Sequence, residues 1–221
     1  MITPELTRRH AFLAGLAALP ALGAAARPAR AAVGPLGPTL PGFQRFQLGS
    51  FEVVPLLAGA RTSDRPQETF GLNASPEEFA ALAERNFIPA DRTRNSFTPV
   101  LVNTGAELVL FDTGLAPDGV TAALAAAGYS PGQVDLVVLT HMHGDHIGGL
   151  MGEGLTFPNA RYLAGAVEYD HWAKAGNEGF DGKVRPLAGK MTMVKGGDSA
   201  LPGLTAIDAP GHTPGHMAWR L

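Results

Sequence analysis

Apolar residues along the chain are grouped in short runs that glycine, proline and polar residues separate. Runs of about four to eight apolar or alternating residues between such breaks are typical of β-strands. Two of the breaks, at residues 49–50 and 104–106, are short enough to turn one strand back on the next. We expect strands at residues 43–48, 51–57, 96–103, 107–111, 134–139, 161–164, 191–194, 204–209 and 217–221.

Three segments have the composition of helices. Ser75, Pro76 and Glu78 provide a capping side chain, a proline in the first turn and an early acidic residue, so a helix is expected to begin there. The second segment is rich in alanine and stops at Gly128. We expect helices at residues 75–86, 118–127 and 166–175. Strands that alternate with helices in this order predict an α/β layered domain.

The amino-terminal segment has the features of an export signal. Arg8 and Arg9 stand before an uncharged apolar stretch at residues 11–26, and small residues near position 31 offer a cleavage site. The alternatives are an amphipathic helix or a membrane span, but the stretch is shorter than the roughly 18 to 20 residues that a span needs. We therefore expect residues 1–31 to be a twin-arginine signal peptide, which predicts a periplasmic or secreted protein.

The length of 221 residues is sufficient for one domain with a sizeable core. Residues 32–42 are rich in proline and glycine and are expected to be a linker, so the domain spans residues 43–221. The chain has no cysteine. Disulfides, thiolate zinc sites and a cysteine nucleophile are therefore excluded, and any metal ion must be held by nitrogen and oxygen.

The charge balance argues against a polyanionic partner. The formal net charge is −3, and removal of residues 1–31 takes away four arginines and one glutamate, which leaves about −6. No run of Lys and Arg is interleaved with aromatic residues. We therefore expect a small-molecule substrate, no nucleic-acid partner and no stable membrane span, while the oligomeric state stays undetermined.

Three histidines and an aspartate fall within six residues, directly after the apolar run at residues 134–139. His141 and His143 are two positions apart, so at the end of a strand both would project from the same face. Asp145 and His146 follow on a turn that glycine loosens, which lets their side chains point back toward the first pair. The alternative is a chance cluster or a set of polar caps. We interpret the segment as a metal site.

The pattern His-x-His-x-Asp-His after a buried strand resembles the metallo-β-lactamase superfamily. The segment Phe-Asp-Thr-Gly at 111–114 and the segment Gly-His-Thr-Pro-Gly-His at 211–216 strengthen the resemblance. The flanking residues 101–105 and 157–160 are similar to the branch that contains methyl parathion hydrolase and lactone-cleaving relatives. The resemblance implies a four-layer αββα sandwich, of which this chain would hold the amino-terminal half and the start of the second half.

The resemblance also implies roles for individual residues. It makes His141, His143 and His212 the ligands of one zinc-type ion, and Asp145 and His146 ligands of a second, with Asp145 also expected to act in catalysis. Three neutral imidazoles leave a tetrahedral ion one open position for water, as in catalytic zinc sites. Asp112 is expected to orient a ligand histidine or the ligand loop, although a plain turn residue is the alternative.

Other residues are less decided by the sequence. His216 is expected to be a hydrogen-bonded loop residue, and His171 a residue of a helix surface or pocket wall, so neither is predicted to be a ligand. Phe97, Trp172 and Phe180 are candidates for an apolar mouth over the metal ions, but each can equally be a core residue.

The predicted function is that of a zinc-type hydrolase with one or two ions, in which metal-bound hydroxide attacks a lactone, an ester or a phosphotriester. A β-lactamase or a glyoxalase-type thioesterase on the same scaffold is the alternative, because a fold does not determine a function. A single-iron oxygenase is less consistent with three nitrogen ligands. The hypothesis that does not involve an enzyme is a chain that binds metal without turnover.

The last residues, 217–221, have the pattern of a strand that has just begun. The family that the sequence resembles continues further, with an aspartate that bridges two metal ions and one more histidine. We therefore expect the domain to be incomplete at its carboxyl terminus, which would leave the second ion with two ligands.

Overall fold

The computed structural model describes residues 39–221. The predicted signal peptide at residues 1–31 and most of the predicted linker at 32–42 lie outside the described residues, and residues 39–42 contain neither helix nor strand. Within the described part, no helix is both long enough and apolar enough to cross a membrane.

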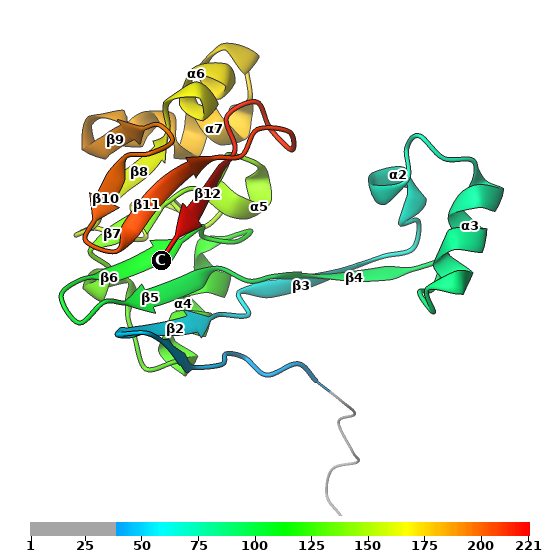
Figure 1. Cartoon of the computed structure of the whole chain (residues 1–221), viewed down its shortest axis with the longest axis horizontal. Helices are drawn as coiled ribbons and strands as arrows, with labels where there is room; N and C mark the ends of the chain where they lie inside the picture. Colours follow the sequence, from blue (N-terminus) through cyan, green and yellow to red (C-terminus); the bar gives the residue numbers. More distant parts are fainter. Residues whose placement is uncertain (1–38) are drawn as a thin grey trace, which may run out of the picture. The chain divides into compact units, whose positions relative to one another are not determined.

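A seven-stranded mixed sheet is the centre of the domain (Figure 1). Its strands lie in the order β1-β2-β5-β6-β7-β8-β9, so β3 and β4 are not part of it. The strands are β1 (Phe46–Leu48), β2 (Phe51–Pro55), β5 (Val100–Asn103), β6 (Leu108–Phe111), β7 (Leu136–Val138), β8 (Arg161–Gly165) and β9 (Met191–Val194).

Half of this sheet is parallel. The strands β6, β7, β8 and β9 pair in parallel, whereas β1, β2, β5 and β6 pair antiparallel. The connections between the parallel strands contain helices, as long crossover connections usually do. These helical segments are α4 (Pro117–Ala126), η1 (Pro131–Gln133), α5 (Gly144–Ile147), α6 (Ala166–Ala175), α7 (Glu178–Lys183) and η2 (Arg185–Lys190). The carboxyl ends of the parallel strands therefore meet at one edge of the sheet.

The two faces of the large sheet are buried by different partners. On β6, Leu108 and Leu110 point to a cluster that includes side chains of α4 and α7, while Val109 and Phe111 point to the opposite cluster. That second cluster is completed by a three-stranded antiparallel sheet of β10 (Ser199–Leu201), β11 (Leu204–Asp208) and β12 (Met217–Arg220). Helices, a large sheet and a small sheet thus form three layers, which agrees with the predicted α/β class.

The segment between β2 and β5 differs from the prediction. Residues 96–103 do not form one strand: β4 (Thr93–Phe97) pairs with β3 (Gly59–Ser63) in a separate ribbon, and β5 begins after Pro99. Proline has no N–H to donate and interrupts the ladder. The ribbon carries α2 (Gln67–Phe70) and α3 (Pro76–Arg85), and the predicted capping by Ser75 is confirmed, with Glu78 completing a capping box.

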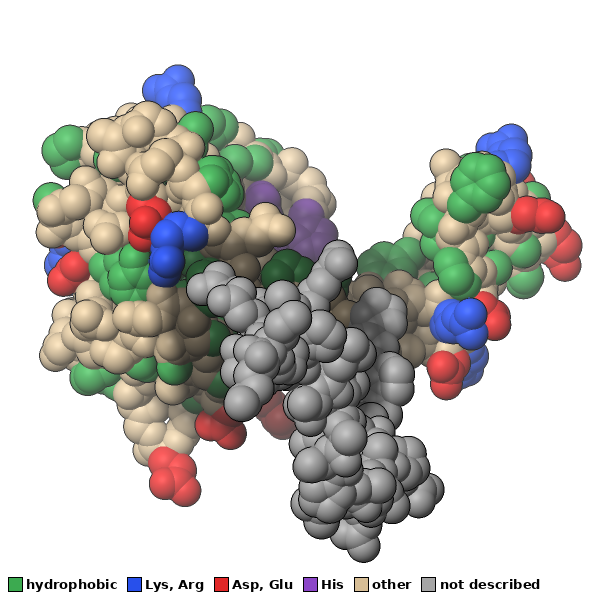
Figure 2. Space-filling view, turned by 90° about the horizontal axis from the view of Figure 1, so that it is seen from below, with side chains coloured by type: hydrophobic (Ala, Val, Ile, Leu, Met, Phe, Trp, Pro, Cys, Tyr) green, Lys and Arg blue, Asp and Glu red, His purple; other side chains and the backbone are tan. Residues whose placement is uncertain are grey.

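Hydrophobic side chains remain exposed on the segment that carries α2 and α3, as the green surface on the right of Figure 2 shows. Phe87 is 97% exposed and Leu72 is 80% exposed, so this segment contributes little to the core.

Strands 43–48 and 134–139 are shorter in the structure than predicted, and the sequence analysis missed α2, β3, α7 and β10. The missed elements are short and are held by their neighbours rather than by a periodic pattern of their own.

A pair of glycine substitutions tests how tightly the layers are packed. Gly119 lies inside α4, and a Cβ there would clash with the carbonyl oxygen of Ala58. Gly182 lies inside α7, and a Cβ there meets no atom within 4 Å. Gly119→Ala is expected to lower the free energy of unfolding by about 1–3 kcal/mol. Gly182→Ala should raise the free energy of unfolding by less than about 1 kcal/mol. Urea unfolding measures both, and equal effects would contradict this view of the packing.

Candidate metal centre

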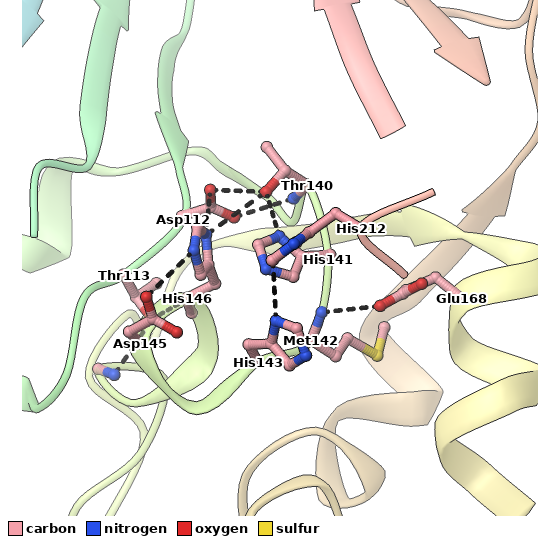
Figure 3. Close-up of polar contacts among 11 residues, drawn as sticks. Asp112, Thr113, Thr140, His141, Met142, His143, Asp145, His146, Glu168 and His212 are labelled. Carbon is pink, nitrogen blue, oxygen red and sulfur yellow. Dashed lines mark hydrogen bonds and ion pairs between the residues drawn. The ribbon is translucent and has the colours of Figure 1, made fainter. Parts of the chain in front are cut away.

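Three parallel strands deliver polar side chains to the same edge of the large sheet. Asp112 follows β6, the segment Thr140–His146 follows β7, and Glu168 lies in the first turn of α6, which follows β8. The connection from β11 to β12 in the small sheet brings His212 to the same place (Figure 3). The topology of the domain therefore brings together residues that are up to 100 positions apart.

Three histidines converge at this edge. One ligand atom from each of His141, His143 and His212 lies within 4.8 Å of the others. His143 Nδ1 and His212 Nε2 are 3.1 Å apart, and His141 Nε2 is buried with no hydrogen-bond partner. A buried polar nitrogen without a partner is costly. The three nitrogens fit a divalent ion, because they would all be satisfied by coordination to it.

A hydrogen-bonded chain determines which nitrogen of His141 is free. The Thr140 hydroxyl donates its hydrogen to Asp112 Oδ2 at 2.8 Å, and the Thr140 backbone N–H donates to Asp112 Oδ1 at 2.9 Å. His141 Nδ1 lies 3.0 Å from the same hydroxyl oxygen, which can only accept there because its hydrogen is used. The proton of His141 is thus on Nδ1, which leaves the lone pair of the buried Nε2 available to an ion.

Asp112 is at the centre of this network. Its backbone φ is 59°, in the left-handed region that Asp tolerates better than most residues. In this conformation the carboxylate also lies 2.8 Å from His146 Nδ1. Asp112 therefore contacts both the ligand loop and a predicted ligand histidine, and its role as an orienting residue stays a prediction.

Asp145 and His146 form a separate pair beside the three histidines. Asp145 Oδ2 lies 3.4 Å from His146 Nε2, and both side chains are partly exposed. They border a cavity of about 100 Å³ that Phe97 and Pro99 also line. The geometric group of three histidines does not include them. The prediction that they hold a second ion stays a prediction.

Burial sets the protonation of the converging histidines. Burial, and then the charges of the neighbouring histidines, lower the pKa of His141 from 6.5 to about 3. Burial and the neighbouring His212 lower the pKa of His143 as well. Both side chains are therefore neutral at neutral pH, which is the form of imidazole that binds a metal ion.

His146 behaves in the opposite way. Burial lowers its pKa, but the hydrogen bond to Asp112 and the negative charges of Asp112 and Asp145 outweigh burial and raise the pKa above 6.5. The carboxylates therefore favour the protonated imidazole, which cannot act as a ligand. A cation bound between Asp145 and His146 would have to displace that proton.

Within residues 39–221, His171 and His216 are not members of the converging group of three histidines. His171 is exposed on α6, as expected. His216 lies beside His141, with ring centroids 5.0 Å apart, but its Nδ1 is buried without a hydrogen-bond partner. The expectation of a hydrogen-bonded ring is therefore wrong at this nitrogen.

Of the three aromatic residues proposed to line an apolar mouth, one lies in the core and two lie near the site. Phe180 is fully buried in the core, so it cannot line an open mouth. Trp172 is half-buried, and its ring meets the His143 ring edge to face at 5.5 Å. Phe97 borders the small cavity with Asp145. Some histidine side chains are visible at the molecular surface, shown in purple in Figure 2.

The sequence analysis missed Thr140 and Glu168. Thr140 relays the Asp112 hydrogen bond to His141, and its only signal in the sequence is its place directly before the histidine motif. Glu168 is buried beside the histidine loops, and in the sequence it looks like an ordinary acidic residue of a helix first turn.

The fold and the histidine cluster define an α/β protein with a candidate metal centre. The family model described as the metallo-beta-lactamase superfamily matches residues 98–221, which is more than half of the chain. The chain therefore belongs to the metallo-beta-lactamase superfamily.

Individual relatives are distant. The uncharacterized protein YobT of Bacillus subtilis (strain 168) is 28% identical over 152 residues, which covers 64% of this chain and 63% of YobT. An N-acyl homoserine lactonase of a Bacillus species is 28% identical over 101 residues, which covers 46% of this chain and 38% of the lactonase. The chain thus spans less than two thirds of these curated relatives.

A solved structure shows the same fold. AidC, a dizinc quorum-quenching lactonase in complex with a product, matches with a TM-score of 0.70 and 24% identity. The match covers 80% of this chain and 69% of AidC. The likeness supports the predicted metallo-β-lactamase-like fold.

Metal retention tests the ligand set. His141→Ala and His212→Ala each remove one of three converging nitrogens, so each is expected to lose the tightly bound ion, whereas the exposed His171→Ala should retain it. Elemental analysis after zinc loading and gel filtration measures the ion content, and we expect about one tightly held zinc per wild-type chain. Equal loss of zinc in all three variants would show that the ligand assignment is wrong.

The lowered pKa of His141 predicts a pH dependence of the metal-free chain. The unfolded chain takes up a proton at His141 below about pH 6.5, whereas the folded chain does so only near pH 3. Stability from this residue is therefore present above pH 6.5 and is lost as the pH falls, by about 2 kcal/mol between pH 7.5 and pH 5. His141→Gln should remove this difference. Urea unfolding at the two pH values checks it, and an unchanged pH dependence in the variant would contradict the burial of a neutral His141.

Proposed function

We propose that this chain is the metal-binding part of a hydrolase that cleaves ester-like bonds. The observation that carries the proposal is the convergence of His141, His143 and His212, with the buried Nε2 of His141 lacking any other partner. Nitrogen donors without a thiolate favour zinc or a similar divalent ion. The dizinc centre named for AidC supports the same choice of metal, although AidC shares only 24% of its sequence with this chain.

The residues of the chain have distinct parts in this proposal. His141, His143 and His212 hold the ion, and Asp112 keeps the proton of His141 on Nδ1 through Thr140. When bound by these three residues, a divalent ion would supply the activation of water as a nucleophile at neutral pH.

Asp145 is the candidate catalytic carboxylate. It is partly exposed, borders the small cavity and lies beside His146 Nε2. A carboxylate in this position can accept a proton from water or, together with His146, hold a second cation. Either role places its negative charge beside the reacting group of a substrate in the cavity.

The substrate class that we favour is a lactone or a related ester. N-acyl homoserine lactonases occur among the sequence relatives of this chain. The wall at Phe97 and Pro99 gives the cavity an apolar side next to Asp145. An apolar wall facing polar groups suits an ester carbonyl with an attached hydrocarbon.

Two other functions are the alternatives to a lactone or ester hydrolase. A thioesterase finds support in a hydroxyacylglutathione hydrolase of Synechococcus, which is 33% identical over 103 residues. A chain that binds an ion without turnover is the second alternative.

Export through the twin-arginine segment remains part of the proposal, and a periplasmic or secreted location follows from it.

Turnover by the zinc-loaded chain tests the proposal. We expect hydrolysis of a chromogenic lactone or ester that outpaces a chromogenic thioester, with Asp145→Asn lowering kcat by about 10²–10⁴-fold while zinc stays bound. His171→Ala is the matched control and should keep the wild-type rate, because its side chain is exposed and away from the cavity. Bound zinc without turnover of any of these substrates would favour the chain that only binds metal.

A further inference from the structure

Glu168 is a buried carboxylate between the two histidine loops. Its side chain is 1% exposed, and it lies in the first turn of α6 at the carboxyl end of β8. No lysine or arginine is paired with it among the ion pairs of the described residues. Burial of a charged group without a cation is costly, so the groups that satisfy it must be well placed.

Four hydrogen bonds satisfy Glu168, and they are divided between its two oxygens. Oε1 accepts from the backbone N–H of Met142 at 3.0 Å and from Trp172 Nε1 at 2.7 Å. Oε2 accepts from the Thr213 hydroxyl at 2.7 Å and from the backbone N–H of Gly215 at 3.1 Å. One oxygen therefore holds the loop after β7, and the other holds the loop before β12.

The residues held by Glu168 are direct neighbours of the converging histidines. Met142 stands between His141 and His143, and Thr213 follows His212. Gly215 packs so closely on α6 that a Cβ there would clash with the backbone of Glu168. The two loops belong to different sheets, so a single carboxylate joins the large sheet to the small one at the site.

Trp172 extends the same arrangement to a ligand ring. Its indole N–H is bound by Glu168 Oε1, and its ring stands edge to face against His143 at 5.5 Å. The ring of His143 is thus confined on one side by a residue that Glu168 orients.

We propose that Glu168 is a positioning residue that sets the separation of the His141–His143 loop from the His212 loop, and so sets the affinity of the metal centre. The inference rests on the proposed metal centre and adds to it a residue that touches neither the ion nor the substrate. Hydrogen bonds to groups that support metal ligands typically change metal affinity by about 10–100-fold when removed.

Glu168→Gln keeps the shape of the side chain and tests this role. An amide nitrogen donates and cannot accept, so one of the two loops loses its acceptor and faces a second donor. We expect the dissociation constant for zinc to rise by about 10–100-fold, measured by competition with a chromophoric chelator. The visible spectrum of the cobalt-loaded variant should lose intensity relative to the wild type, because the three nitrogens no longer form a regular tetrahedral set.

A matched pair at position 213 separates positioning from general support of the fold. Thr213→Val removes the hydroxyl and keeps the volume, and it should weaken zinc binding by about tenfold. Thr213→Ser keeps the hydroxyl and should bind zinc as tightly as the wild type, even if the lost methyl group lowers the melting temperature of the metal-free chain.

The outcomes separate this inference from the proposed function. Wild-type zinc affinity and wild-type cobalt spectra in both Glu168→Gln and Thr213→Val would overturn the positioning role and leave the metal centre in place. Equal weakening in Thr213→Ser and Thr213→Val would overturn it too, since the hydroxyl would then be irrelevant. A wild-type chain that binds neither zinc nor cobalt would overturn the metal centre and this inference together.

Discussion

The parallel pairing of β6, β7 and β8 is the constraint on which the candidate site depends. Parallel strands end at the same edge of a sheet. This edge therefore brings together three groups that are far apart in the sequence: Asp112, the loop that begins at Thr140, and Glu168. The small sheet then adds His212 from the opposite layer. Each carboxylate lies where it can hold a histidine-bearing loop, so the geometry of the site follows from the register of the strands.

The sequence predicted the layered α/β class and the group of histidines because both depend on strong local patterns. Short apolar runs mark the buried strands, and His141 and His143 stand next to one of them. The physical argument for their common face was only partly right, because β7 ends at Val138 and both residues lie on the loop beyond it. The contribution of Thr140 and Glu168 depends on contacts over 28 and 45 positions, which no local pattern records.

The ribbon of β3 and β4 shows a different limit. Its strands are partly exposed and mostly polar, so their sequences lack the alternation of apolar and polar residues that marks a half-buried strand. Each strand is held mainly by the other through five paired residues that are 30 to 38 positions apart. Pro99 was the available sign that residues 96–103 could not be one strand, because a proline inside a run demotes it.

Asp112 Oδ2 accepts from the Thr140 hydroxyl and also lies 2.8 Å from His146 Nδ1. One oxygen atom thus serves both the three-histidine cluster and the neighbouring Asp145–His146 pair. A change in the charge of His146 alters the basicity of that oxygen, and the change reaches His141 through the threonine hydroxyl. The two halves of the site are therefore energetically linked. If protonation of His146 changes the free energy of ion binding at the three-histidine cluster, ion binding must change the free energy of protonation of His146 by the same amount.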